Sequence, residues 1–375
     1  MTSPATDTPM TIVVIGMTLS SSWGNGHATT FRSLLRGARA LGHRTLFLEC
    51  ERPWFSANRD MPHPDFCELD YFDTPQDLVD RHGHAIRRAD AVIIGSYVPH
   101  GAEVIAAVAA LQPERLCFYD IDTPVTLRRL QEDNEEYITR DQVPLFDIYF
   151  SFSGGANLER LETDYRAQRA EALYCSVDPD LYRPTGAPRQ WDLGYLGTYS
   201  DDRQPVLERL LIEPARRLPE KKFVVAGAQY PASIDWPDNV ERIEHVPPAE
   251  HADFYSRQRF TLNVTRQDMV RAGWSPSVRL FEAAACGTPV ISDIWPGLEE
   301  LLPDGEAILL APDSEAVVAA LTETDDGRLA EIADAARRRV MADHTGRARA
   351  EELIAALASL KGRRAEASAT ASSAV

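Results

Sequence analysis

The sequence has few cysteines and no paired cysteine motif. Its 375 residues include five cysteines, none of them in a C-x-x-C spacing, and an odd number cannot all pair within one chain. This pattern disfavours a disulfide framework, and we expect reduced thiols in the core. The cysteines are Cys50, Cys67, Cys117, Cys175 and Cys286.

Long apolar runs and an excess of positive charge are also missing. Residues 1–10 lack the basic start and apolar stretch of a signal peptide, and no apolar run reaches the roughly 20 residues of a membrane span. The 39 Lys and Arg against 57 Asp and Glu give a net charge of −18, which disfavours binding to nucleic acid or anionic membranes. No His or Asp cluster has a metal-coordination spacing. We expect a cytoplasmic, metal-independent enzyme without an integral membrane segment or a nucleic-acid partner.

The sequence does contain a regular alternation of short apolar runs and helical patterns. This order is typical of α/β proteins with a parallel sheet covered on both faces. The pattern runs through the first half and restarts after residue 190, so we predict two Rossmann-like halves. Strands are expected at 11–15, 45–48, 91–94, 116–119, 148–152, 192–196, 223–225, 240–243, 260–263, 289–291 and 308–310, with the main helices at 31–41, 75–89, 102–111, 156–163, 203–217, 249–255 and 277–286.

The segment 271–293 combines a helix start, a carboxylate and a strand. Ser275 is expected to cap the helix, and Pro276 suits its first turn. Gly287 is expected to end the helix before a short buried strand. The backbone amides from Ser275 to Val278 would then face an anion at the positive end of the helix. This segment therefore predicts a phosphate and ribose site.

This segment resembles glycosyltransferases of the GT-B fold, notably family four and the CgeB-like (spore maturation protein-like) branch. The resemblance rests on the run E-A-A-A-C-G-T-P-V-I that begins at Glu282. It implies that Glu282 binds the ribose of a nucleoside diphosphate sugar and that Ser275, Pro276, Ser277 and Val278 hold its pyrophosphate. The position of a further family-four Glu is occupied by Trp274. A purely structural alternative is a surface ion pair between Arg279 and Glu282.

A second resemblance concerns the passage between the halves. Val177, Asp178 and Pro184 match the family-four segment G-V-D-x-x-x-F-x-P, with Tyr182 in place of Phe and Ser176 in place of Gly. In this fold the last helix commonly returns to the first domain. The expected organisation is a disordered tail at 1–10, an acceptor domain at 11–174, a linker at 175–190, a donor domain at 191–343, a crossover helix at 344–361 and a disordered tail at 362–375.

Three further residues of the second half are donor-site candidates. Arg203 and Arg266 each follow a predicted strand, and arginine binds diphosphate oxygens well. Arg203 could instead lie at a solvated helix start beside Asp201 and Asp202, and Arg266 could pair with Asp268. Gly227 either turns the chain or lets the backbone approach the nucleotide.

The first half is expected to supply the acceptor side. Its first loop, with Trp23, Gly24, Asn25 and Gly26, lies between a strand and a helix but lacks a complete dinucleotide fingerprint. His27 at the helix start is the first candidate for a catalytic base, and a structural helix-start histidine is the alternative.

Two carboxylates are further candidates for the base. Asp120 and Asp122 follow a strand in the same way, although an Asp before Thr-Pro is also common in turns.

These observations predict a glycosyltransferase of the hexosyltransferase type that uses a nucleoside diphosphate sugar donor and no cofactor. The acceptor, a small molecule, glycan or protein, would bind in the cleft between the domains. The alternatives are a nucleotide-sugar 2-epimerase of the same fold and a noncatalytic sugar- or nucleotide-binding protein. A nicotinamide oxidoreductase is less favoured, because only Glu49 suits its ribose ligand and the glycine fingerprint is broken.

Overall fold

The computed structural model describes residues 8–23, 26–360 and 362. The chain divides into two compact units, the first formed by Met1–Ser176 with Gly346–Val375 and the second by Val177–Thr345. Of the predicted linker, residues 175–176 thus belong to the first unit and residues 177–190 to the second. Most of the two predicted tails lies outside the described residues. Met10, at the end of the first tail, donates its amide hydrogen to His43 Nδ1 at 3.0 Å.

The first unit contains a seven-stranded sheet with parallel pairing in the order β3-β2-β1-β4-β5-β6-β7. The central strands β1, β4 and β5 are mainly apolar, as expected for a sheet that is buried on both faces. The strands are β1 (Thr11–Gly16), β2 (Arg44–Cys50), β3 (Glu68–Phe72), β4 (Ala91–Gly95), β5 (Leu116–Asp120), β6 (Ile148–Ser151) and β7 (Ala170–Ala172).

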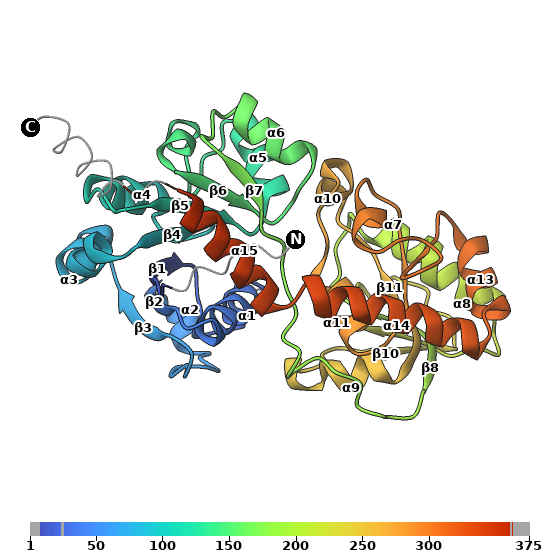
Figure 1. The fold of residues 1–375 in the computed structure, drawn as a ribbon. Helices are drawn as coiled ribbons and strands as arrows, with labels where there is room; N and C mark the ends of the chain where they lie inside the picture. Colours follow the sequence, from blue (N-terminus) through green and yellow to red (C-terminus); the bar gives the residue numbers. More distant parts are fainter. Residues whose placement is uncertain (1–7, 24–25, 361, 363–375) are drawn as a thin grey trace, which may run out of the picture. The chain divides into compact units, whose positions relative to one another are not determined.

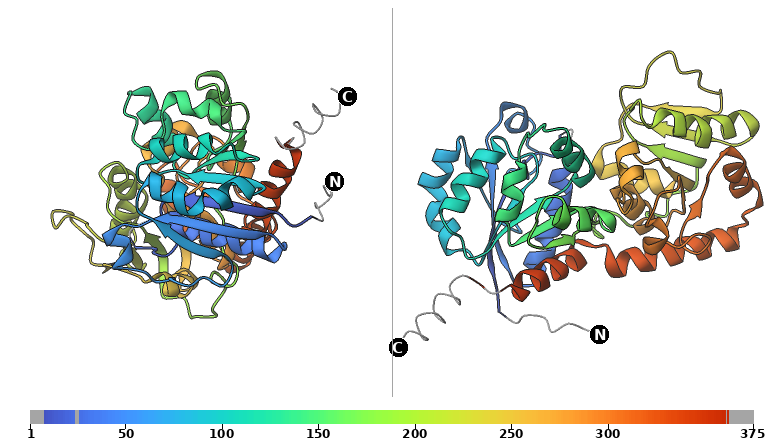
Figure 2. Two further views of the ribbon diagram at one scale, coloured as in Figure 1. Left: turned by 90° about the vertical axis from the view of Figure 1, so that its left-hand side faces the viewer. Right: turned by 90° about the horizontal axis from the view of Figure 1, so that it is seen from above.

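Helices cover both faces of this sheet (Figures 1 and 2). Apolar side chains of α3 to α6 share a core with one face, and those of α1 and α15 share a core with the other. The helical segments are α1 (His27–Ala40), α2 (Pro53–Ser56), α3 (Pro75–Arg88), α4 (Gly101–Ala110), α5 (Thr123–Gln131), η1 (Arg140–Leu145), α6 (Ala156–Thr163) and α15 (Gly346–Ser359).

The last helix, α15, packs along α1, as Figure 1 shows. Their backbones meet at two glycines, because a Cβ atom on Gly37 would lie 2.1 Å from the carbonyl oxygen of Gly346. A Cβ atom on Gly346 would lie 2.1 Å from the carbonyl oxygen of Ser33. The C-terminal helix therefore belongs to the first unit and needs small residues at this contact.

The second unit contains a six-stranded sheet with parallel pairing in the order β10-β9-β8-β11-β12-β13. Its helices include a π-helical turn, η2, that ends two residues before Pro214, which has no N–H for a regular helical hydrogen bond. The strands are β8 (Trp191–Leu196), β9 (Phe223–Ala226), β10 (Val240–Ile243), β11 (Gln258–Asn263), β12 (Val290–Ser292) and β13 (Leu309–Leu310). The helical segments are α7 (Gln204–Leu207), η2 (Glu208–Ile212), α8 (Glu213–Arg217), η3 (Pro248–Glu250), α9 (His251–Ser256), α10 (Gln267–Ala272), α11 (Val278–Ala285), α12 (Leu298–Leu301), α13 (Ser314–Glu323) and α14 (Asp326–Asp343).

The predicted architecture of two Rossmann-like halves is confirmed. The structure adds two strands at the edges of the first sheet, β3 and β7, that the sequence pattern did not predict. β3 is only partly buried and carries polar residues, and β7 has three residues. Within the described residues, no helix is long and apolar enough to cross a membrane.

Candidate functional site

The carboxyl ends of β8, β9, β11 and β12 bring the candidate residues of the second unit to one edge of its sheet. The loop after β8 and the start of α10 are joined there, because the Asp202 carboxylate accepts a hydrogen bond from the amide of Gln267 at 3.1 Å. Ligands of open α/β sheets bind at this edge. The arrangement therefore agrees with a binding site built by several loops.

The start of α11 differs from the prediction by two residues. The helix is capped by Ser277, whose side chain accepts from the Arg279 amide, and the prediction that Ser275 is the cap is wrong. The Ser275 hydroxyl donates to the carbonyl of Gly273 at 2.7 Å, so it is engaged in the preceding turn. Pro276 consequently lies before the cap. Val278 is the first helical residue.

Glu282 is buried in α11 and held by two tyrosines. Its Oε2 accepts a hydrogen bond from the Tyr255 hydroxyl at 3.0 Å. Burial, together with the charge of Glu282 and a hydrogen bond to it, raises the pKa of Tyr182 well above its usual value. The sequence analysis did not single out these tyrosines as partners of Glu282, although Tyr182 lies in the family-like segment between the halves. The two phenols fix the orientation of the carboxylate.

Arg279 is a site residue that the sequence analysis considered only as an ion-pair partner. It is buried, and it donates to the Leu196 carbonyl at 2.8 Å and to Asn263 Oδ1 at 3.0 Å. Its guanidinium also lies over the ring of Tyr195. The alternative of a surface ion pair between Arg279 and Glu282 is therefore wrong.

A buried polar network fixes the residues around Arg279. Asn263, at the end of β11, donates to the hydroxyls of Thr265 and Ser292. Asp293 accepts from the amide and the hydroxyl of Thr265, both at 2.8 Å, and burial raises its pKa. Because these buried polar groups satisfy one another's hydrogen bonds, they form a rigid support for the Arg279 side chain.

Three arginines lie close together at this edge. Burial lowers the pKa of Arg203, and the nearby positive charges of Arg279 and Arg266 lower it further. Arg203 donates to the Thr198 carbonyl at 2.7 Å, while its buried Nε has no hydrogen-bond partner among the described residues. Arg266 is exposed. Within the described part of the chain, neither Arg203 nor Arg266 forms an ion pair with a carboxylate, so their charge is available to an anion.

The nearby acidic residues have other partners. Asp201 accepts from the Tyr199 hydroxyl at 2.6 Å, and Asp268 pairs with Arg271 at 3.5 Å. The alternative ion pair of Arg266 with Asp268 is therefore not what the structure shows. Arg203 is the half-buried N-cap residue of α7, so it does lie at a helix start, and its role as a phosphate ligand stays a prediction.

Gly227 permits a close approach of two strand ends. Its φ angle is 151°, and a Cβ atom there would lie 2.0 Å from the carbonyl oxygen of Gly197. Arg242 supports this contact by donating to the carbonyl oxygens of Val225 and Gly227, and it lies over the rings of Tyr230 and Trp236. The glycine is needed because the two backbones pack too closely there for a side chain.

Trp274 has an unusual backbone conformation in the loop before α11. Its φ angle is 42°, which is rare for a residue with a side chain. The amide donates to the Pro296 carbonyl at 2.7 Å, and the indole Nε1 donates to Glu300 at 2.9 Å. Strain of this kind is common at ligand-binding loops.

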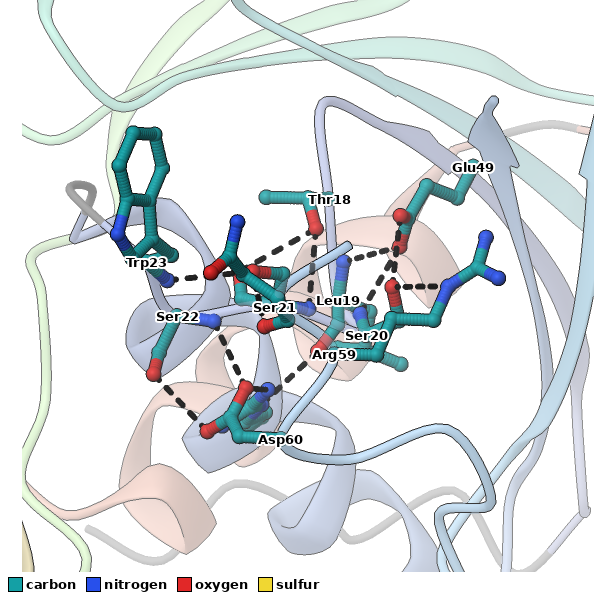
Figure 3. A network of polar contacts seen from close by, with 11 residues as sticks. Thr18, Leu19, Ser20, Ser21, Ser22, Trp23, Glu49, Arg59 and Asp60 are labelled. Atoms are coloured by element: carbon teal, nitrogen blue, oxygen red, sulfur yellow. Dashed lines mark hydrogen bonds and ion pairs between the residues drawn. The ribbon is translucent and has the colours of Figure 1, made fainter. Parts of the chain in front are cut away.

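In the first unit, the loop after β1 is held by the end of β2 (Figure 3). Glu49 is completely buried, and its carboxylate accepts hydrogen bonds from the amides of Leu19 and Ser20 and from the Ser20 hydroxyl, at 2.7 to 2.9 Å. Because both of its oxygens bind the protein, Glu49 is not available as the ribose ligand of a nicotinamide cofactor. This finding removes the main support for an oxidoreductase.

His27 and Asp122 meet at the carboxyl edge of the first sheet. His27 Nε2 lies 3.2 Å from Asp122 Oδ2, and the imidazole is buried while the carboxylate is 41% exposed. His27 Nδ1 is buried and has no partner among the described residues. A carboxylate on one nitrogen favours the tautomer in which the other nitrogen can accept a proton.

Asp120 is completely buried behind this pair. It accepts hydrogen bonds from the hydroxyls of Tyr149 and Thr126 and from the amide of Asp122, at 2.7, 2.9 and 3.1 Å. Desolvation raises its pKa to about 6. Asp120 thus orients Asp122 through its backbone.

The remaining residues of the first loop are described only in part. Trp23 is 57% exposed, and Gly26 is the residue before α1. Gly24 and Asn25 lie outside the described residues. Within the described residues, no three His, Cys, Asp or Glu side chains gather in a way that could hold a metal ion.

Comparison with known proteins places these sites in a known fold. HepE from Anabaena, in complex with UDP-glucose, matches with a TM-score of 0.63 at 15% identity, covering 94% of this chain and 100% of that one. Sucrose-phosphate synthase from Thermosynechococcus elongatus matches with a TM-score of 0.66 at 14% identity, covering 92% and 97%. An alpha-glucosyltransferase in complex with UDP-glucose and DNA matches with a TM-score of 0.67 at 14% identity, covering 94% and 100%. The chain has the GT-B fold.

Two sequence comparisons relate part of this GT-B chain to glycosyltransferases. Residues 203–355 match the family model described as glycosyl transferase-like. The D-inositol 3-phosphate glycosyltransferase of Mycobacterium sp. strain KMS is 26% identical over 159 residues, which is 36% of this chain and 34% of that protein. The match spans about a third of the length of this curated relative. The family-model match, at residues 203–355, lies mostly in the second unit.

Proposed function

We propose that the protein is a glycosyltransferase that moves a hexosyl group from a nucleoside diphosphate sugar to an acceptor hydroxyl. The observation that carries this proposal is the group of three neighbouring arginines, Arg203, Arg266 and Arg279, beside the start of α11. The family model covers all three. The proposal includes the CgeB-like assignment and takes UDP-glucose as the first donor to test, because solved structures of this fold hold it.

In the proposed donor site, Glu282 accepts hydrogen bonds from the ribose hydroxyls, and the amides at the start of α11 contact the diphosphate. Tyr255 and Tyr182 keep the Glu282 carboxylate in place. When the bond between the sugar carbon and the phosphate oxygen breaks, negative charge develops on the departing diphosphate. Arg203 and Arg266 stabilise that charge, and such preorganised electrostatics is usually the largest part of catalysis.

In the proposed acceptor site, His27 is the general base. The Asp122 carboxylate accepts from His27 Nε2, so that Nδ1 carries a lone pair. As the acceptor oxygen bonds to the sugar carbon, its proton passes to the pair of His27 and Asp122, of which the Asp122 carboxylate is the exposed member. Asp120 is buried too deeply to touch an acceptor, and we assign it the positioning of Asp122. The matches to glycosyltransferases favour transfer over epimerisation.

Thermal unfolding with nucleotides tests the proposal. A ligand at 100 times its Kd stabilises a protein by about 2.7 kcal/mol, so UDP, GDP or dTDP should raise the Tm. Glu282→Gln and Arg266→Gln should each lower the affinity for the same nucleotide about 10- to 100-fold, the effect of losing a charged hydrogen bond. His27→Ala should retain that affinity and lower kcat for transfer by about 10²- to 10⁴-fold.

Arg271→Gln is the matched control. Arg271 lies in α10, five residues after Arg266, its side chain is 73% exposed, and it pairs with Asp268. Nucleotide affinity should be unchanged in this variant. Stabilisation by NAD alone, or equal loss of affinity in Arg271→Gln and Arg266→Gln, would contradict the proposed donor site.

A further inference from the structure

The loops after β1 and β2 form one surface that the proposed function does not yet use. We call it the tryptophan platform, formed by residues 18–23 and 53–60. Of the described residues, five large hydrophobic side chains are exposed, and two of them are on this platform: Trp23 at 57% and Trp54 at 51%. β1 and β2 pair in parallel, so both loops leave the same edge of the sheet. Trp23 is four residues before His27 in the chain.

The backbones of the two tryptophans are connected by hydrogen bonds. The Ser21 hydroxyl accepts from the Trp23 amide at 3.3 Å and donates to the Asn58 carbonyl at 2.8 Å. The Asn58 side-chain amide donates to the Trp54 carbonyl, also at 2.8 Å. Figure 3 shows Trp23 and Ser21 within this network. Two exposed indoles on a fixed backbone are suited to binding a rigid ligand, because little conformational freedom is lost.

The charges of the platform are already neutralised. Asp60 forms two hydrogen bonds with Arg32, both at 2.8 Å, and Arg59 pairs with Glu51 at 2.5 Å. Burial alone would raise the pKa of Asp60, but the bonds from Arg32 and Ser22 hold it at about 2. A phosphate or a nucleic-acid backbone would therefore find no free cation on the platform, in contrast to the arginines of the second unit.

We propose that the tryptophan platform binds the acceptor and that this acceptor is a neutral pyranose sugar, an inference that rests on the proposed glycosyltransferase function. A pyranose ring has an apolar face of C–H groups that can lie flat on an indole, and its edge carries hydroxyls. Aromatic side chains provide that apolar surface, and the half-buried Ser22 hydroxyl, which donates its own hydrogen to Asp60, can accept a hydrogen bond from a sugar hydroxyl. The polar rim and the aromatic face together match an uncharged, hydroxyl-rich ring.

Binding of sugars without a donor gives the first test. Saturation-transfer NMR with methyl glucosides, maltose and cellobiose should show ring protons in contact with the wild-type protein. Trp23→Ala and Trp54→Ala should each weaken this binding about tenfold, as expected for a central aromatic contact, and Trp23→Phe should restore part of it. Leu145→Ala is the matched control, because Leu145 is 41% exposed but precedes β6 at the opposite edge of the same sheet.

Transfer kinetics gives the second test. With UDP-glucose as donor, the alanine variants should raise KM for the pyranoside acceptor about tenfold and leave KM for the donor unchanged. Absence of sugar binding, or sugar binding that is unaffected in both tryptophan variants, would overturn the inference. Tighter binding of a single-stranded oligothymidylate than of any sugar, lost on Trp23→Ala, would overturn it in favour of a nucleic-acid ligand.

The two proposals fail in different ways. If UDP stabilises the protein through Glu282 but no pyranoside binds the platform, the sugar acceptor is wrong and the glycosyltransferase remains. If pyranosides bind at the tryptophans but no nucleoside diphosphate stabilises the protein, the glycosyltransferase is wrong.

Discussion

Asp120 illustrates how a single buried residue can hold the backbone of a neighbouring candidate site residue in place. It is fully buried beneath the pair formed by His27 and Asp122, and its hydrogen bonds come from Tyr149, Thr126 and the Asp122 amide. Desolvation raises its pKa from 3.8 to about 6. A carboxyl group that keeps its proton longer in the folded state makes folding depend on pH.

We expect this dependence to have a definite sign. Between about pH 4 and pH 6, the folded chain retains the Asp120 proton that the unfolded chain has released, so the free energy of unfolding should fall as pH rises through this window. The contribution of Asp120 amounts to at most about 3 kcal/mol, from roughly two pKa units. The measurement is urea unfolding at several pH values for wild type and Asp120→Asn. The difference between the two should change across this window, and a constant difference would show that Asp120 titrates normally.

At the scale of elements, the contact between α1 and α15 depends on glycine. Gly37→Ala would place a methyl group 2.1 Å from the Gly346 carbonyl oxygen, so the helices would have to separate. We expect the free energy of unfolding to fall by about 1–3 kcal/mol, the usual effect of overpacking. Thermal or chemical unfolding of the variant measures this loss.

Gly83→Ala is the control for this prediction. Gly83 lies inside α3, and its added Cβ would meet other atoms only at 3.7 Å. This substitution should stabilise the protein by about 0.5–1 kcal/mol, because alanine loses less backbone entropy in a helix. If both variants lose the same stability, close helix packing is not the cause.

Elements also show how far the sequence predicts the structure. Strands that are almost entirely apolar, such as β1 and β4, were predictable because burial on both faces leaves a continuous apolar pattern. The partly exposed edge strand β3 carries no such pattern. The helix cap was misplaced from Ser277 to Ser275 because both serines flank Pro276, and local propensity alone does not distinguish them.

One segment carries the signal that places Glu282 on a helix followed by a buried strand, and its role as the ribose ligand stays a prediction. Its partners were not predictable, because they come together only in three dimensions. Tyr255 lies in α9 and Asn263 at the end of β11, and nothing in their local sequence relates them to Glu282 or Arg279. Glu49 had the spacing of a ribose ligand, but the folded loop uses its carboxylate for its own amides.

At the scale of the whole molecule, we expect turnover to be independent of metal ions. The proposed charge stabilisation comes from Arg203, Arg266 and helix amides, all supplied by the chain itself. Incubation with EDTA should therefore leave both transfer from UDP-glucose and nucleotide binding unchanged. A loss of transfer that added Mg²⁺ or Mn²⁺ restores would mean that a metal ion takes part.

The two points at which the chain crosses between its units make the second unit suitable for exchange by protein engineering. The Val177 amide donates to the His344 carbonyl at 2.9 Å, so the first and last residues of the second unit are neighbours. In the first unit, Ser33 contacts both residues at which the chain leaves and re-enters the unit. Its hydroxyl lies 2.9 Å from that of Ser176, and its backbone packs against Gly346. The second unit is thus an insertion with adjoining ends, the arrangement in which domain insertion is best tolerated. Residues 177–345 form a cassette that can be exchanged for the corresponding unit of another chain of this fold. Under the proposed function, such an exchange would change the donor preference and leave the acceptor side unchanged.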